Sequence, residues 1–412
     1  MWMDLKMGWR NIWRNPRRSI LTVGAIAFAT LLLVFMLSWQ FGSYETMINS
    51  AVRTHTGHLQ VQAEGYRSKQ SMRLVVSRPD RVGALLNGMP DVAAYTFRGN
   101  AFSLASSKER TYGALVIGID PPREAEVSTL EKLVREGSYL SHEDTNQALV
   151  GKLLANNLKV SLGDEIVLLG QGRDGSIAAT AVKVKGIFRS GEDTFDRSSL
   201  HIPLNFFQDT YAMRGAVHEV VILAENLEAV PALKQTIKER IEKAVENGDL
   251  VVLDWKELMP GLIDAIRMDL ISGFIFYIIL IVVVAFSILN TFLMAIFERT
   301  KEFGILMAIG TKPSRLTKIL LIESTTMTAA GIALGILMGS LVTWYFQVHG
   351  ILISGATELL RQFGLPERMY PQLSVLSASI GAGIVLVITL LTALYPAFKV
   401  RRLKPVEAMA AV

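Results

Sequence analysis

Residues 270–297 decide the fold: LISGFIFYIILIVVVAFSILNTFLMAIF contains no charged side chain. Because an α-helix rises about 1.5 Å per residue, a run of this length is enough to cross a hydrocarbon layer of about 30 Å. Three other runs have the same character, namely 20–41, 373–398 and 319–346, the last interrupted only by Glu323 near its start. The sequence therefore predicts an integral membrane protein with four transmembrane helices.

The first of these runs, ILTVGAIAFATLLLVFMLSWQF, follows a cluster of cations and has some features of a cleaved signal peptide. The apolar core of a signal peptide is about 7–15 residues long, however, and no small-residue cleavage site follows this run. We therefore predict an uncleaved first helix over residues 19–42. Residues 1–18 place Trp2, Trp9 and Trp13 among cations, a pattern typical of an interfacial amphipathic helix that ends near Pro16.

The composition agrees with a membrane protein that also carries a soluble domain. Of 412 residues, 50% are hydrophobic and 19% are charged, and the mean hydropathy is +0.35. A typical soluble domain carries about 25% charge, so the deficit indicates membrane segments. Four spans of about 20 to 25 residues occupy only about a quarter of the chain, and the remainder is long enough for a domain with its own core.

The positive charges are distributed unevenly around the four runs. They concentrate in the N-terminal flank, in the 298–318 connection and in the 399–412 tail, whereas the 347–372 loop has two arginines balanced by two glutamates. With four spans, the three cation-rich segments share one side of the membrane, and an excess of lysine and arginine marks the cytoplasmic side. We therefore predict cytoplasmic N- and C-termini, and we attribute the net charge of +5 to membrane orientation and not to nucleic-acid binding.

Residues 43–269 then form one large extracytoplasmic domain between the first helix and the second, over 270–297. The remaining parts are the cytoplasmic 298–318 loop, helices over 319–346 and 373–398, a short extracytoplasmic 347–372 loop and a cytoplasmic 399–412 tail. Within the large domain, alternating or β-rich patterns predict strands over 58–63, 114–119, 164–170, 181–188 and 218–224. Helical patterns cover 79–88, 146–159 and 228–247. This mixture predicts an α+β domain.

Motifs of enzymatic chemistry are missing from the sequence. It has no G-x-x-x-x-G-K-[ST] run to hold nucleotide phosphates, no H-E-x-x-H and no nucleophile elbow. It also has no cysteine, which excludes disulfides and thiol chemistry. His55 and His58 lie beside a predicted strand, and we interpret them as surface residues and not as metal ligands. The sequence therefore predicts a protein that is not an enzyme.

The 298–318 connection, ERTKEFGILMAIGTKPSRLTK, is the most informative short segment. It places a short amphipathic stretch, KEFGILMAIG, before the helix breakers Gly310 and Pro313. Its apolar side chains must be buried against something. One interpretation is an interfacial helix that lies on the membrane, and the other is a helix that docks into a groove on a cytoplasmic partner.

These residues carry a resemblance to a known family. Residues 298–310, ERTKEFGILMAIG, resemble the motif ER-x-x-E-[FI]-G-x-[LM]-[RK]-A-[LI]-G of FtsX/MacB-type (type VII) ABC transporter permeases, except that Met307 stands where the family often has a basic residue. The opening WRNIWRNPRR and the endings YPA and PVEAM are similar to the family's patterns. GKLLA at 151–155, VSLGD at 160–164 and GIFRSG at 186–191 resemble its MacB-like periplasmic core domain.

The resemblance implies a mechanism and a set of partners. Two permeases pair, as two copies or as a copy and a paralogue, and each binds a separate cytoplasmic ATPase that holds ATP and Mg²⁺. No cofactor is then expected in this chain. The 298–318 loop becomes the coupling helix, which the ATPase pushes so that the transmembrane helices move the outer domain. Its expected contact residues are Glu298, Arg299, Glu302, Phe303, Gly304, Ile305, Leu306, Met307 and Gly310.

Within the family, the size and layout look most like lipoprotein-releasing permeases of the inner membrane, which pass their substrate to a periplasmic carrier. A cavity for acyl chains between the first two helices would be lined by Phe28, Leu32, Phe35, Phe274, Tyr277 and Leu280, although the same side chains could simply face lipid. Alternatives are a mechanotransmitting subunit that activates a cell-wall hydrolase, an efflux permease, and a membrane-anchored binding protein without an ATPase.

Several residues inside the predicted helices indicate helix packing. Gly331, Gly335 and Gly339 repeat every fourth residue of the third helix, which lets another helix approach closely within the subunit or at a dimer contact. Glu323 could have a structural or a functional role, with Lys318 or Arg315 within reach. Gln40 and Asn290 are expected to make hydrogen bonds between helices.

Overall fold

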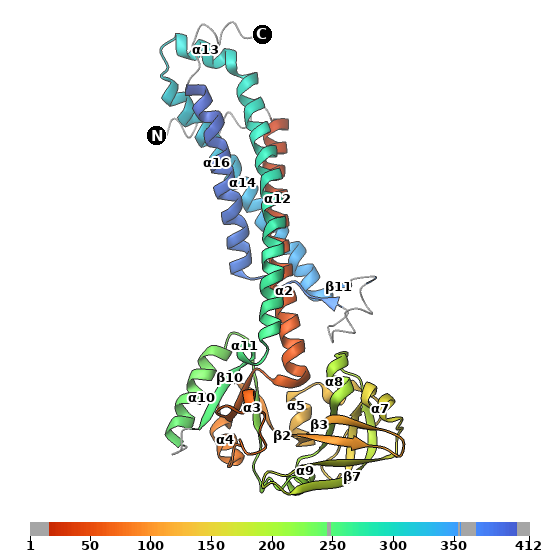
Figure 1. The fold of residues 1–412 in the computed structure, drawn as a ribbon. Helices are drawn as coiled ribbons and strands as arrows, with labels where there is room; N and C mark the ends of the chain where they lie inside the picture. Colours follow the sequence, from red (N-terminus) through yellow and green to blue (C-terminus); the bar gives the residue numbers. More distant parts are fainter. Residues whose placement is uncertain (1–15, 245–248, 353–354, 356–367, 402–412) are drawn as a thin grey trace. The chain divides into compact units, whose positions relative to one another are not determined.

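The structure is a computed structural model that describes residues 16–244, 249–352, 355 and 368–401 (Figure 1). The chain divides into two compact units. The helical unit comprises Met1–Tyr44, Ala265–Leu352 and Arg368–Val412, and the sheet unit comprises Glu45–Asp264 and Ile353–Glu367. The predicted interfacial helix over residues 1–18 and the 399–412 tail fall largely outside the described residues.

Four long helices dominate the helical unit: α2 (Pro16–Ala51), α12 (Pro260–Glu298), α14 (Pro313–His349) and α16 (Val375–Arg401). Among the described residues, these are the helices long and apolar enough to cross a membrane. α14 begins with a proline, whose missing N–H costs nothing in a first turn, where such groups lack a helical partner anyway. A short pair of strands, β11 (Ile351–Leu352) and β12 (Arg368–Met369), joins the segments between α14 and α16.

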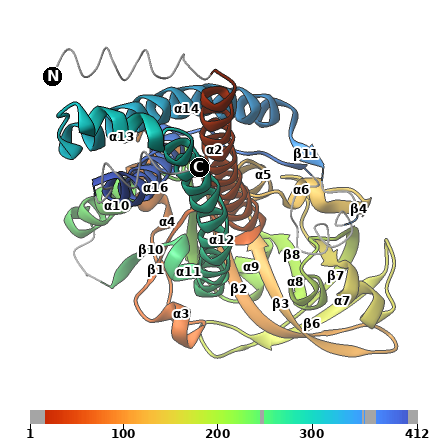
Figure 2. The same ribbon diagram turned by 90° about the horizontal axis from the view of Figure 1, so that it is seen from above.

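Small side chains allow α14 to approach α2 closely within this chain (Figure 2). A Cβ placed on Gly331 would lie 2.7 Å from the Ile26 side chain, and one on Gly335 would lie 2.5 Å from Cβ of Thr30. Gly339 faces Leu31 and Val34 in the same way. The glycine stripe therefore packs against α2, and the packing is within one subunit.

We expect Gly335→Ala to destabilise the helical unit. The new methyl group would also lie 2.6 Å from the carbonyl oxygen of Ala27, which is backbone and cannot rotate away, so α14 must move from α2. Overpacking of this kind costs about 1–3 kcal/mol. Unfolding of the detergent-solubilised protein, followed by circular dichroism, measures the loss. Gly383→Ala in α16 is the control, because a Cβ there meets nothing within 4 Å; equal behaviour of the two variants would contradict the prediction.

The sheet unit is built around a ten-stranded mixed sheet in the order β10-β1-β9-β2-β3-β8-β5-β7-β4, with β6 paired to β2 and β7. Pairing is mostly antiparallel, but β3–β8 and β5–β7 are parallel. The strands are β1 (Leu59–Ala63), β2 (Val92–Ser106), β3 (Thr111–Ile119), β4 (Val134–Gly137), β5 (Gln147–Gly151), β6 (Glu165–Gln171), β7 (Ile177–Phe188), β8 (Ser199–Pro203), β9 (Glu219–Ala224) and β10 (Leu250–Asp254).

Short helices cover this sheet and connect its strands (Figure 1). The largest, α10 (Val230–Ala244), presents an apolar stripe in which Leu233, Ile237 and Ile241 are buried. The others are η1 (Val52–Thr56), α3 (Tyr66–Lys69), α4 (Pro79–Leu86), α5 (Pro121–Val127), α6 (Leu130–Leu133), α7 (Lys152–Leu158), α8 (Asp193–Ser198), α9 (Leu204–Thr210) and α11 (Trp255–Leu258).

The five predicted strands and two of the three predicted helices are present in the sheet unit. The prediction of a continuous helix over 146–159 is wrong, because residues 147–151 form β5 and only α7 is helical. β5 lies between β8 and β7 and is almost wholly buried. A short apolar run of this kind has no alternation, so it looks the same as the start of a buried helix.

The interpretation of His55 and His58 as surface residues is also wrong. His55 is half-buried, with its ring centre 5.1 Å from that of Phe195, and His58 is 2% exposed. Its Nδ1 accepts a hydrogen bond from the backbone N–H of Ala224 at 3.1 Å. His201 and His218 are buried as well. Burial lowers the pKa of His201 to about 3 and the pKa values of His58 and His218 to about 4, so the folded domain holds these rings neutral.

We expect the sheet unit to lose stability as the pH falls from 6.5 toward 4.5. An unfolded chain protonates its histidines near pH 6.5, whereas the buried rings stay neutral, so acid favours the unfolded state. The maximum slope is about 1.4 kcal/mol per pH unit for each such histidine. His201→Phe, placed among Phe188 and Phe195, should reduce the slope by about that amount. Denaturant unfolding across this pH range tests it, and a flat profile would refute it.

Candidate functional site

The connection between α12 and α14 forms a separate short helix, α13 (Thr300–Ala308). Arg299 interrupts the helical path between α12 and α13 with φ −107° and ψ 9°. At the other end Gly310 has φ +100°, a conformation that suits glycine, and its N–H donates to the carbonyl oxygen of Met307 at 3.0 Å. Pro313 then begins α14. The two predicted breakers therefore end one helix and start the next.

The apolar residues of this segment divide into two groups. Phe303 and Met307 are buried in a cluster with Ile296 of α12 and Leu316 of α14, and Leu320 packs against it. Gly304 is buried beside them. The inward-facing side chains are therefore a hydrophobic seat that attaches α13 to the two long helices.

The second group faces outward. Ile305, Leu306 and Ile309 are 51%, 42% and 78% exposed, and we call these three residues the docking patch. Ile305 and Ile309 are four residues apart and so lie on one side of the helical turn. Covering each of these side chains would contribute about 1.5–3 kcal/mol. The patch is therefore able to contribute strongly to binding a partner.

An ion-pair cluster connects the start of α13 to α14. Arg299 Nη1 donates to Oε2 of Glu323 at 3.1 Å, and its Nε donates to Oε2 of Glu302 at 3.3 Å. The guanidinium also lies 5.3 Å from the centre of the Phe303 ring. Glu323 is buried, and its partner Arg299 lies 24 residues earlier in the chain. Lys318 and Arg315 are near Glu323 in the sequence, whereas Arg299 reaches its carboxylate only in the folded chain.

A chain of hydrogen bonds connects α2 to α12. The Tyr277 hydroxyl donates to Oε1 of Gln40 at 2.8 Å, Gln40 Nε2 donates to the Tyr44 hydroxyl at 2.8 Å, and that hydroxyl donates to Asp269 at 2.6 Å. The expectation of an interhelical hydrogen bond is therefore confirmed for Gln40. Asn290 is exposed in this chain.

The six residues predicted to line a substrate cavity are spread over α2 and α12. Phe28 and Phe274 are each 62% exposed, whereas Tyr277 and Leu280 pack against the buried cluster around Ile26. Leu32 and Phe35 are half-buried. Phe28 instead lines an apolar groove of about 650 Å³ together with residues of α14. The cavity between the first two helices therefore stays a prediction.

A buried ion pair that the sequence analysis did not identify lies in the sheet unit. Arg98 of β2 contacts Glu124 of α5 through two hydrogen bonds of 2.5 and 3.0 Å, and it also donates to the carbonyl oxygen of His55. Burial by itself would raise the pKa of Glu124, but the guanidinium outweighs it and lowers the pKa. Nothing in the β2 sequence distinguishes Arg98 from a solvent-facing arginine, because its partner belongs to another element.

Two family models match the chain in succession. Residues 19–240 match the MacB-like periplasmic core domain, and residues 274–405 match the FtsX-like permease C-terminal domain. Together with the four apolar helices, these matches define an ABC transporter permease. The chain belongs to the FtsX/MacB-type, or type VII, family of these permeases. The predicted architecture of four helices and a large mixed domain is thereby confirmed.

The chain is similar along its length to several named permeases. It is 23% identical to the lipoprotein-releasing system transmembrane protein LolC of Neisseria meningitidis, with 96% of this chain and 95% of that protein covered. It is 24% identical to LolC of Xylella fastidiosa, covering 73% and 74%. It is 22% identical to the macrolide export ATP-binding/permease protein MacB of Nitrobacter winogradskyi, covering 96% of this chain and 58% of that protein.

Two solved structures are similar to about half of this chain. The extracellular domain of the transporter YknZ from Gram-positive bacteria aligns at 15% identity with a TM-score of 0.36, covering 48% of this chain and 99% of that one. The periplasmic region of MacB from Actinobacillus actinomycetemcomitans aligns at 11% identity with a TM-score of 0.38, covering 50% of this chain and 91% of that one.

Permeases of this family work with cytoplasmic ATPases, which use ATP and Mg²⁺.

Proposed function

We propose that this chain couples ATP hydrolysis by a separate cytoplasmic ATPase to movement of its sheet unit at the outer face of the inner membrane. In this arrangement both termini and α13 lie in the cytoplasm, as the distribution of lysine and arginine predicts. Two permease subunits, which are either identical or paralogous, pair with each other within the membrane. The chain itself binds no nucleotide and carries no cofactor.

The observation that carries this proposal is the division of α13 into a buried seat and an exposed docking patch. The seat and the Arg299–Glu323 pair attach the helix to α12 and α14, while Ile305, Leu306 and Ile309 remain available to a partner. A force applied to the patch would therefore act on two long helices at once. We assign the coupling role to this patch, with Glu298 and Gly310 at the two ends of the segment.

We further propose that the substrate is a lipoprotein or another hydrophobic molecule, which is extracted at the outer face and passed to a periplasmic carrier. The support is the similarity to LolC of Neisseria meningitidis, which extends over 95% of that protein. The similarity to MacB supports an efflux permease as the second candidate.

Purification of the membrane complex with its native partners tests both the proposed coupling to an ATPase and the proposed substrate. Mass spectrometry should identify a short ATPase and a second permease chain, and a co-purified acylated protein would support lipoprotein release. A bound cell-wall hydrolase would favour the mechanotransmitting alternative instead. A complex without any ATPase would refute the coupling mechanism.

A further inference from the structure

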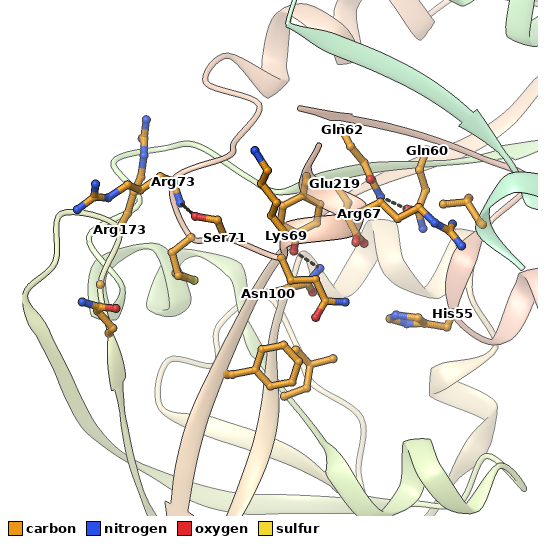
Figure 3. Close-up of a pocket in the computed structure, with 18 of the residues that line it drawn as sticks. His55, Gln60, Gln62, Arg67, Lys69, Ser71, Arg73, Asn100, Arg173 and Glu219 are labelled. Atoms are coloured by element: carbon orange, nitrogen blue, oxygen red, sulfur yellow. Dashed lines mark hydrogen bonds between the residues drawn. The ribbon is translucent and has the colours of Figure 1, made fainter. Parts of the chain in front are cut away.

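The sheet unit contains a cavity of about 760 Å³ with a buried polar floor and a basic rim (Figure 3). The floor is formed by Gln60 and Gln62 of β1, Asn100 of β2 and Glu219 of β9. Gln60, Gln62 and Glu219 are 3%, 2% and 8% exposed, and Asn100 is half-buried. A cavity floor of this composition requires a partner for each of its polar atoms.

The hydrogen bonds along β1 leave one acceptor without a donor. A backbone carbonyl only accepts, so Gln60 Nε2 must be the donor in its 2.8 Å contact with the Thr56 oxygen. Gln60 Oε1 then accepts from Gln62 Nε2 at 2.5 Å. These two contacts fix which atom donates in each hydrogen bond. Gln62 Oε1 is therefore left as a buried acceptor with no donor among the described residues.

Two further acceptors lie in the same floor. Glu219 pairs directly with Gln62 in the β1–β9 register, and its buried Oε2 has no donor among the described residues. Asn100 Nδ2 donates to the Tyr66 hydroxyl at 3.1 Å, and the Asn100 amide also donates to the Glu219 carboxylate, but Asn100 Oδ1 has no donor among the described residues. Burial raises the pKa of Glu219, and a protonated carboxyl group would supply one hydrogen for these acceptors. At least one of the three positions would still need a donor from outside the chain.

The rim of the cavity is basic, whereas its floor presents hydrogen-bond acceptors. Arg67, Lys69 and Arg73 are exposed on and after α3, and Arg173 approaches from the turn between β6 and β7 (Figure 3). Arg173 donates to the Met213 carbonyl oxygen at 3.2 Å and has further N–H groups available. Four cations at one opening are suited to hold a carboxylate or a phosphate.

We propose that this cavity binds a small zwitterion, with a primary ammonium group on Gln62, Asn100 and Glu219 and a carboxylate or phosphate on the basic rim. A primary ammonium has three N–H donors, which matches the three acceptors without donors. Two sources carry this chemistry, namely the amino terminus of a short peptide and an ethanolamine phosphate headgroup. The proposal goes beyond the permease function and does not depend on an ATPase.

Calorimetric titration of the full-length protein in detergent tests the proposal with matched probes. Phosphoethanolamine and phosphocholine carry the same phosphate, but the quaternary ammonium of phosphocholine has no N–H donor. We expect phosphoethanolamine to bind roughly tenfold more tightly or better, since hydrogen bonds to charged groups are lost in phosphocholine. An alanyl-alanine dipeptide and its N-acetylated form make the same comparison for the peptide source, and the tighter of the two ammonium probes identifies the source.

Two sets of variants separate the floor from the rim. Glu219→Gln, which keeps the side-chain shape, should remove the preference for the ammonium probes. The double variant Lys69→Ala and Arg73→Ala should weaken both phosphate probes and leave the preference unchanged. Lys108→Ala, an exposed change away from the cavity, is the control for net charge. The proposal is overturned if neither ammonium probe binds, if phosphocholine binds as tightly as phosphoethanolamine, if Ca²⁺ binds in their place, or if a folded Glu219→Gln protein keeps the preference.

Discussion

Replacing Ile309 with aspartate is expected to reduce association with the ATPase by roughly a hundredfold or more. Ile309 is the most exposed member of the docking patch, and a buried isoleucine contributes about 1.5–3 kcal/mol to an interface. An aspartate at the same place must also be desolvated without a partner, which adds to the loss. Every 1.4 kcal/mol is about a tenfold change in affinity, so the combined effect exceeds two orders of magnitude.

Co-purification and ATPase stimulation in nanodiscs would measure this effect, with circular dichroism to verify that the variant is folded. Phe303→Asp and Gly304→Asp, the changes that the motif alone suggests, are less suitable, because both positions are buried in the hydrophobic seat and would also disturb α12 and α14. Lys301→Ala is the matched control, an exposed change on α13 outside the patch. Normal ATPase binding by a folded Ile309→Asp protein would exclude the docking patch from coupling.

Removing the Glu124 carboxylate is expected to destabilise the sheet unit by about 3–5 kcal/mol, the usual result of leaving a buried charge without its partner. Arg98 is 2% exposed, so Glu124→Ala leaves its guanidinium buried without this carboxylate. Domains of ordinary stability have about 5–15 kcal/mol in total, so Glu124→Ala should approach global unfolding. Amide hydrogen exchange of β2 and β9 in the detergent-solubilised protein reports this loss locally.

A second variant distinguishes the loss of an ion pair from the loss of packing. Changing Arg98 and Glu124 together to methionine and leucine removes both charges and should recover a large part of the stability. Glu136→Ala, which breaks the exposed Lys152–Glu136 pair, should have little effect by comparison. A Glu124→Ala protein as stable as this surface variant would show that the buried pair does not hold β2 and α5 together.

The confirmed predictions rest on residues whose own properties, or those of their immediate neighbours, determine the local structure. A run such as 270–297 is apolar in nearly every position, and length alone then indicates a membrane helix. Gly310 and Pro313 end and begin helices because of their own backbone preferences, whatever surrounds them. The motif of residues 298–310 was sufficient for the family, and the family matches confirm it.

The errors and omissions come from residues whose environment is made by distant parts of the chain. The sequence of β5 predicts part of a helix, because the strands that flank it in the sheet, β8 and β7, come from distant parts of the chain. His58 is buried, and the last residue of β9, Ala224, donates a hydrogen bond to its ring, a contact that its own neighbours in the sequence do not reveal. The cavity of the sheet unit escaped notice because Gln62, Asn100 and Glu219 lie on three strands that are separated in the sequence.

The same contrast holds within the coupling helix. The sequence by itself predicts an amphipathic stretch that ends at the breakers Gly310 and Pro313, and the resemblance of residues 298–310 implies a cytoplasmic partner, because spacing and backbone preference are properties of adjacent residues. The tertiary structure determines that Phe303 and Met307 are buried in the hydrophobic seat against Ile296 and Leu316, that Ile309 is exposed, and that Glu323 pairs with Arg299. The physical reason is that a side chain is buried or paired by the element that packs against it. How α12 and α14 pack against α13 is set by the folded structure and not by the residues of α13 alone.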